Sequence, residues 1–116
     1  MSEIQIYHNP RCSKSRETLA LLQEHGQQVQ VIEYLKDTPS AAELKTLLKK
    51  LGLKARDLLR NKEQEYSDLG LSNPALSDDE IINTMVAHPK LIERPIVVVG
   101  KHARIGRPPE NVLEIL

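Results

Sequence analysis

The chain has 116 residues, and its 16 basic side chains are balanced by 16 acidic ones, so its formal net charge is zero. A chain of this length is expected to fold as one domain, which we place over residues 1–116. The balanced charge argues against a broad surface for nucleic acid, because such binding depends on an excess of basic groups.

Cys12 is the only cysteine of the chain. A single cysteine cannot form an internal disulfide, which excludes the disulfide-stabilised secreted folds and a self-contained dithiol cycle. The N-terminus lacks a signal-peptide pattern, and the longest strongly apolar run, Ile96–Val99, is far too short to cross a bilayer. We therefore expect a cytoplasmic protein with no membrane partner, whose redox chemistry would need a second thiol from another molecule.

The first third of the chain predicts a β-α-β unit. Ile4–Tyr7 alternates like a short strand that ends near His8, where an Asn-Pro pair supplies turn residues. Residues 13–24 favour a helix, and Val29–Leu35 is rich in the β-branched and aromatic residues of a second strand. A strand, helix and strand of this length normally form a right-handed parallel crossover. Cys12 is thus expected at the N-terminus of the first helix.

The middle of the chain predicts a set of helices. Residues 40–52 combine a capping box, leucines at helical spacing and a final glycine. A second capping box at 77–80 opens a helix that ends before Pro89. Residues 54–60 favour another short helix, whereas residues 62–71 have weak periodicity and fit either helical turns or a loop.

The C-terminal third predicts two strands and a helix. Ile96–Val99 is a continuous apolar run between a proline and a glycine, as expected of a central strand buried on both faces. Gly100 can turn this strand into an antiparallel partner at 103–105, and Pro109–Leu116 then forms the last helix. A β-α-β unit, a helical insertion and a β-β-α unit follow one another in the order of the thioredoxin-like α/β fold.

Cys12 has the sequence neighbours of a reactive thiol. Cysteine is a nucleophile as its thiolate, and the unpaired N–H groups and dipole of a helix N-terminus lower the thiol pKa. The same N–H groups bind oxyanions. His8 and three basic residues near Cys12 favour the thiolate further; the basic residues are Arg11, Lys14 and Arg16. The alternative is an inert buried cysteine with solvated basic neighbours.

Two known thiol motifs are absent around Cys12. Position 15 is a serine, so there is no Cys-x-x-Cys redox pair, and Thr18 stands where a phosphatase-type loop would need arginine. A metal site is not predicted either, because the four histidines and the one cysteine show no ligand spacing.

Several motifs together resemble the glutaredoxin-coupled arsenate reductase family, the ArsC-like proteins of thioredoxin-like fold. They run in the family's order over essentially the whole chain from about Ile4, and they are residues 8–16 (HNPRCSKSR), Arg60, residues 93–98 (ERPIVV) and Arg107-Pro108. The resemblance implies an arsenate reductase in which Cys12 attacks arsenate, glutathione displaces arsenite, and glutaredoxin reduces the mixed disulfide left on Cys12. It implies no bound cofactor, because glutathione acts as a co-substrate.

The resemblance also implies the roles of the site residues. Cys12 and His8 are catalytic, with His8 supporting the thiolate, and arsenate or a similar oxyanion is bound by Arg60, Arg94 and Arg107. Like phosphate, arsenate carries roughly −1.5 to −2 charges and suits planar arginine side chains. In thioredoxin-like folds the residue before the strand-opening proline faces the active cysteine, so we expect Arg94 near Cys12 and a cis Arg94-Pro95 peptide. Taken singly, Arg60 could complement the dipole of a helix that it ends, and Arg107 could be a solvated loop residue.

Two other functions are compatible with these residues. One is a thiol oxidoreductase of the same fold, whose Cys12 exchanges with glutathionylated proteins or small disulfides. The other is a binding module similar to the Spx-type regulators of RNA polymerase, although their redox sensing uses a Cys-x-x-Cys pair that Ser15 interrupts. The neutral, mixed-charge surface is compatible with a monomer in each case.

Overall fold

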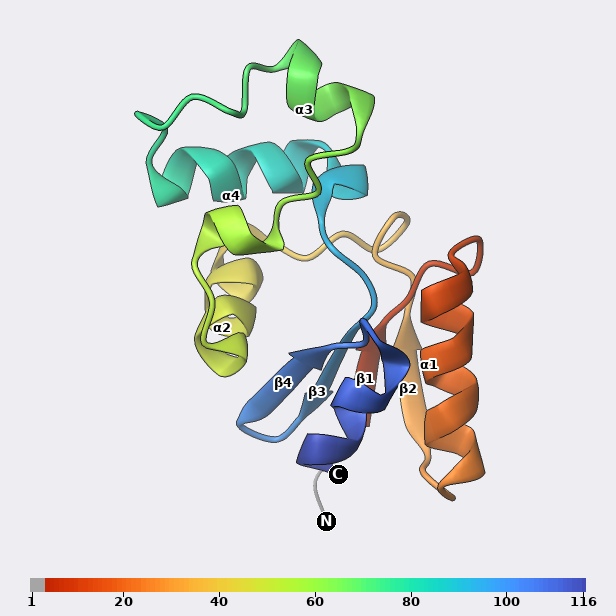
Figure 1. The fold of residues 1–116 in the computed structure, drawn as a ribbon. Coiled ribbons are helices and arrows are strands. Elements are labelled where there is room, and N and C mark those ends of the chain that lie inside the picture. Colours follow the sequence, from red (N-terminus) through yellow and green to blue (C-terminus); the bar gives the residue numbers. More distant parts are fainter. Residues whose placement is uncertain (1–3) are drawn as a thin grey trace. The chain divides into compact units, whose positions relative to one another are not determined.

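The computed structural model describes residues 4–116, whose contacts divide the chain into two compact units (Figure 1). A sheet unit comprises the described residues up to Asp37 together with Arg94–Leu116, and a helical unit comprises Thr38–Glu93. The predicted β-α-β and β-β-α segments thus form one unit, and the predicted insertion forms the other. No helix within residues 4–116 is both long and apolar enough to span a bilayer.

The sheet unit is built on four strands in the order β2-β1-β3-β4 (Figure 1). Strand β1 pairs in parallel with β2 and antiparallel with β3, and β3 pairs antiparallel with β4. The predicted parallel crossover and C-terminal hairpin are therefore confirmed, as is the thioredoxin-like order of elements. The strands are β1 (Ile4–Tyr7), β2 (Val29–Ile32), β3 (Ile96–Val99) and β4 (His102–Ile105).

One face of this sheet is covered by helix α1 (Ser13–Glu24) and by the 3-10 helix η3 (Pro109–Ile115). Ile6 lies opposite Val97 in the β1–β3 register, and both side chains are fully buried in one apolar cluster. Leu22 from α1 and Val112 from η3 complete the cluster. Burying an aliphatic side chain of this size contributes about 1.5–3 kcal/mol to folding. The packing fixes α1, and with it the helix end that carries Cys12.

Strand β2 is shorter than predicted. It ends at Ile32 instead of Leu35, because the chain turns at Glu33, whose carbonyl accepts hydrogen bonds from the N–H groups of Lys36 and Asp37. Apolar and aromatic residues continue past Ile32, so the composition of the segment extends the predicted strand beyond the hydrogen-bonded ladder.

The helical unit contains both predicted capped helices, α2 (Ala41–Leu51) and α4 (Asp78–Ala87), which pack against each other. In each, a serine hydroxyl accepts from the N–H of a glutamate three residues on, and the glutamate reaches back to the serine N–H. Gly52 ends α2 with a φ of 71°, a left-handed conformation that favours glycine. The shorter elements are η1 (Ala55–Leu58), α3 (Gln64–Asp68) and η2 (Pro89–Leu91).

The helix predicted over residues 54–60 is only partly formed. A single 3-10 turn spans Ala55–Leu58, and Leu59 then becomes extended and forms an antiparallel bridge with Ile92. Arg60 therefore lies beyond the helix, and the expectation that it ends a helix and complements its dipole is wrong. The bridge joins the Arg60 segment to the stretch that leads into Arg94.

Candidate active site

Cys12 is the N-cap residue of α1, where the loop after β1 enters the helix, as predicted. Its carbonyl accepts the first helical hydrogen bond from the Arg16 N–H at 3.0 Å, and its own N–H donates to the Asn9 carbonyl at 3.0 Å. The Asn9 side chain closes the turn by accepting from the Arg11 N–H at 3.0 Å. Only 9% of the Cys12 surface is exposed, so the turn holds the thiol in a nearly dry position.

Hydrogen-bond donors converge on the Cys12 sulfur. The backbone N–H groups of Lys14 and Ser15 donate to it from the first turn of α1, and the Arg94 side chain donates to it as well. Arg107 Nη2 lies 3.4 Å from the sulfur. Within the sheet unit, two of the three predicted substrate-binding arginines therefore meet at Cys12.

The balance of these interactions lowers the pKa of the Cys12 thiol. Burial alone raises the pKa, because it removes water from the charged form. The hydrogen bond from the Ser15 N–H, the hydrogen bond and charge of Arg94, and the Lys14 N–H outweigh burial, and the pKa falls below its ordinary value near 9.0. An inert buried cysteine lacks such donors, so the geometry favours the reactive-thiol interpretation.

Arg94 and Arg107 are brought together by the C-terminal hairpin. Arg94 precedes β3 and Arg107 follows β4, so the pairing of these strands places both residues at one end of the sheet. Arg107 Nε donates to the Arg94 carbonyl at 2.8 Å, which joins the two arginines directly. The Arg94-Pro95 peptide is cis, as expected, and so is Arg107-Pro108, which was not predicted.

His8 is connected to the site through Ser15. The His8 Nδ1 atom lies 2.6 Å from Ser15 Oγ, and this Oγ accepts a hydrogen bond from the Asn9 N–H at 3.0 Å. Ser15 is fully buried, and its own N–H is one of the donors to Cys12. His8 is therefore placed to stabilise the turn that holds the thiolate. Ser15 had no predicted role beyond replacing the second cysteine of a redox pair.

The His8 imidazole is neutral near pH 7. Burial lowers the pKa of His8 below its ordinary value of 6.5; the Glu33 carboxylate opposes this by favouring the imidazolium, and the Arg16 charge adds to the lowering. A neutral ring matches the hydrogen bond between Nδ1 and the Ser15 hydroxyl, because a serine can donate to a ring nitrogen that carries no proton.

We expect acid to destabilise the protein through His8. Between pH 6.5 and its lowered native pKa, His8 binds protons more in the unfolded chain than in the native state. The free energy of unfolding therefore decreases as the pH is lowered. His8→Gln should remove this contribution in urea unfolding between about pH 5 and pH 8. The exposed His25 provides the control variant His25→Gln. An unchanged pH dependence in His8→Gln would contradict the prediction.

The basic residues next to Cys12 in the sequence contribute less than the two arginines. Arg11 is exposed, and Lys14 Nζ forms an ion pair with Glu17 at 3.5 Å, with about half of each side chain in solvent. Exposed pairs of this kind are screened and contribute little energy. The predicted positive surroundings of the thiolate therefore come mainly from Arg94 and Arg107.

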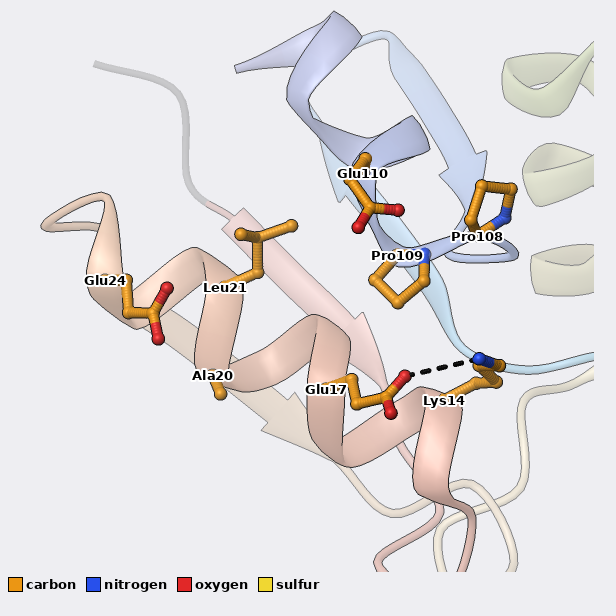
Figure 2. A pocket seen from close by; sticks show the side chains of 8 residues that line it. All are labelled: Lys14, Glu17, Ala20, Leu21, Glu24, Pro108, Pro109 and Glu110. Atoms are coloured by element: carbon orange, nitrogen blue, oxygen red, sulfur yellow. Dashed lines mark ion pairs between the residues drawn. The ribbon is translucent and has the colours of Figure 1, made fainter.

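A groove runs along α1 beside the start of η3 (Figure 2). Its volume is about 490 Å³. Three carboxylates and one lysine make it acidic, so it does not suit an oxyanion. The positive charge complementary to an oxyanion is instead that of Arg94 and Arg107, beside the Cys12 sulfur. The groove is lined by Lys14, Glu17, Ala20, Leu21, Glu24, Pro108, Pro109 and Glu110.

Arg60, the third predicted arginine, belongs to the helical unit and is held there by two carboxylates. Its Nη1 donates to Glu93 Oε1 at 2.7 Å and its Nε to Glu63 Oε1 at 3.3 Å. The Arg60 side chain is only 16% exposed, so these ion pairs are weakly screened. The sequence did not predict this pairing, and the role of Arg60 at a substrate stays a prediction.

A thioredoxin-like sheet, an activated thiolate at a helix N-terminus and two arginines beside it define a thiol-dependent enzyme class. The profile of the ArsC family matches residues 7–115. The chain therefore belongs to the ArsC family, and its full-length similarity to arsenate reductases makes it an oxidoreductase.

Similarity to individual proteins extends over the full length. The protein of Escherichia coli K12 named uncharacterized protein YfgD is 56% identical over 98% of this chain and 97% of its own length. An arsenate reductase of Neisseria meningitidis is 48% identical over the whole of both chains. A solved structure described as arsenate reductase from Vibrio cholerae has a TM-score of 0.97 and 57% identity, and covers 99% of this chain and 98% of that one.

Proposed function

We propose that this protein is a glutathione- and glutaredoxin-dependent arsenate reductase that acts through Cys12. The observation that carries the proposal is a thiol of lowered pKa with an Arg107 nitrogen 3.4 Å from its sulfur and a second arginine, Arg94, donating to the same atom. Full-length similarity to proteins named arsenate reductase supports the choice of substrate. Thiolate and guanidinium groups in contact provide a nucleophile and an oxyanion ligand at one point.

The first step forms a bond between Cys12 and arsenic. The Cys12 thiolate attacks arsenate, the S–As bond forms, and one As–O bond breaks, with the oxygen leaving as water after protonation. Arg94 and Arg107 offset the negative charge of the oxyanion, and their positions beside the sulfur need no rearrangement before attack. The N–H groups of Lys14 and Ser15 hold the thiolate until it reacts.

The later steps need two external thiols. Glutathione thiolate attacks the Cys12 sulfur, an S–S bond forms, and the electron pair of the broken S–As bond stays on arsenic, which leaves as arsenite. Arsenic gains two electrons as two thiols become one disulfide. Glutaredoxin then takes the glutathione and releases the Cys12 thiolate, whose lowered pKa makes it a better leaving group than an ordinary cysteine. An external reductant is required because Cys12 is the only cysteine.

Purified protein should release arsenite from arsenate over many turnovers only when glutathione and glutaredoxin are both present. Without glutaredoxin, one turnover should leave glutathione attached to Cys12, which mass spectrometry detects. Failure to release arsenite in the complete mixture would overturn the substrate assignment. Removal of glutathione from modified proteins in that case would favour the alternative thiol oxidoreductase.

Arg60 is proposed to assist arsenate binding in competition with Glu93 and Glu63. Glu93→Gln removes the nearer carboxylate and keeps its size, so the guanidinium becomes easier to recruit. We expect the KM for arsenate to fall roughly threefold to tenfold with little change in kcat, as for a change in uniform binding. Glu65→Gln alters the net charge of the same unit equally and is the control. A KM that is unchanged or higher in Glu93→Gln would argue against a role for Arg60.

A further inference from the structure

Thr18 is a fully buried polar residue on α1 whose hydroxyl is used locally. Its Oγ1 donates to the Lys14 carbonyl at 2.8 Å and lies 3.4 Å from the Gly106 carbonyl. The shorter bond fixes the side-chain rotamer, because a threonine in a helix has few alternatives. Thr18 therefore presents a rigid surface of Oγ1 and Cγ2 to the chain at Gly106.

Glycine is required at position 106 because there is no space for a side chain. A Cβ atom there would lie 2.5 Å from Thr18 Oγ1, 3.0 Å from Thr18 Cγ2 and 2.8 Å from Pro95 Cγ. Its φ is not positive, so glycine's freedom of conformation is not the reason for this residue. The backbone beyond β4 thus passes directly against both α1 and the start of β3.

Three segments that carry the active-site groups meet at this point, the Thr18–Gly106–Pro95 junction. Thr18 lies on the helix that Cys12 caps, Pro95 follows Arg94, and Gly106 precedes Arg107. The Gly106 N–H also donates to the Pro95 carbonyl at 2.9 Å. This close contact therefore joins the helix that carries the thiol to the segment that leads into Arg107.

We propose that Thr18 and Gly106 are positioning residues that hold Arg107 at the Cys12 sulfur. Arg107 directly follows Gly106. Its Nε donates to the Arg94 carbonyl at 2.8 Å, and its Nη2 lies 3.4 Å from the Cys12 sulfur. Movement of the backbone at Gly106 displaces this guanidinium. Interiors are close-packed, so an added methyl group is accommodated by such movement, and a misplacement of about 1 Å can cost about 100-fold in rate. The consequence for arsenate rests on the proposed function, whereas the consequence for the thiol does not.

Gly106→Ala tests the proposal. We expect the Cys12 pKa, measured from the pH dependence of alkylation, to rise toward its ordinary value, and the KM for arsenate to rise roughly tenfold. In an Arg107→Gln background the same change should have little further effect, because the guanidinium that it displaces is already gone. A wild-type thiol pKa and KM in folded Gly106→Ala, or fully additive effects with Arg107→Gln, would overturn the proposal.

Thr18→Ala provides a second variant that adds no atom, for the case in which Gly106→Ala does not fold. It removes the surface against which Gly106 packs, and it should also raise the Cys12 pKa and the KM for arsenate several-fold. Thr84→Ala is the matched control, because Thr84 makes the same hydrogen bond to a carbonyl four residues back, at 2.7 Å, in the helical unit. Equal behaviour of Thr18→Ala and Thr84→Ala would overturn the proposal. The pKa measurement needs no turnover, so it separates failure of positioning from failure of the arsenate assignment.

Discussion

Cys12→Ser is expected to abolish arsenite release. A serine hydroxyl remains protonated at neutral pH and cannot form a disulfide with glutathione, so both the attack on arsenate and the release of arsenite fail. Loss of a nucleophile of this kind lowers turnover by a factor on the order of 10⁴ or more. The measurement is arsenite release in the presence of glutathione and glutaredoxin.

Three controls accompany Cys12→Ser: thiol titration, a neighbouring variant and thermal unfolding. Thiol titration should fall from one group to none, because Cys12 is the only cysteine. Ser13→Ala changes the exposed neighbouring residue and should keep full activity. Thermal unfolding of Cys12→Ser near the wild-type temperature would exclude loss of the fold as the cause. Substantial turnover by a folded Cys12→Ser protein would refute Cys12 as the nucleophile.

Local signals in the sequence predicted the elements that position the site. Capping boxes and periodic leucines act within a single helix, so α2 and α4 were predictable, as was the β1–α1 turn that places Cys12. The predictions that failed concern the ends of elements: β2 ends early at a local turn, and the segment at residues 54–60 is determined by a distant residue. Leu59 leaves its helix to pair with Ile92, and no local pattern around residues 54–60 contains that information.

The contacts that activate Cys12 were less accessible to sequence analysis. Arg107 reaches the sulfur across 95 positions of sequence, and only the resemblance to a family suggested that the two meet. The sequence around Thr18 and Ser15 contains no pattern that indicates that their hydroxyl groups are buried. The pairing of Arg60 with Glu93 likewise spans 33 positions. The net charge of zero thus gives no indication that two arginines lie beside a thiolate and that a third is paired with carboxylates.

Arg94→Ala is expected to raise the pKa of Cys12 and to weaken arsenate binding. The variant removes both a hydrogen bond and a charge that lower the thiol pKa, while the burial that raises it remains. The pH profile of alkylation should therefore move to higher pH, leaving less thiolate at neutral pH. Loss of one such donor usually costs about 10²- to 10³-fold in rate, so we expect kcat/KM for arsenate to fall by that factor. Arg94→Lys keeps the charge without the planar donors and should be intermediate.

Measurement at two pH values separates the two effects of Arg94. At a pH above the plateau of the variant's own alkylation profile, the thiol is ionised in both proteins, so a defect caused only by thiol activation would vanish there. We expect a residual loss of roughly tenfold at that pH, because in the proposed function the guanidinium also binds the oxyanion. Arg104→Ala is the matched control, since Arg104 is a partly exposed arginine on β4 that pairs with Glu114 at 3.3 Å. An alkylation profile in Arg94→Ala identical to that of wild type would show that Arg94 does not activate Cys12.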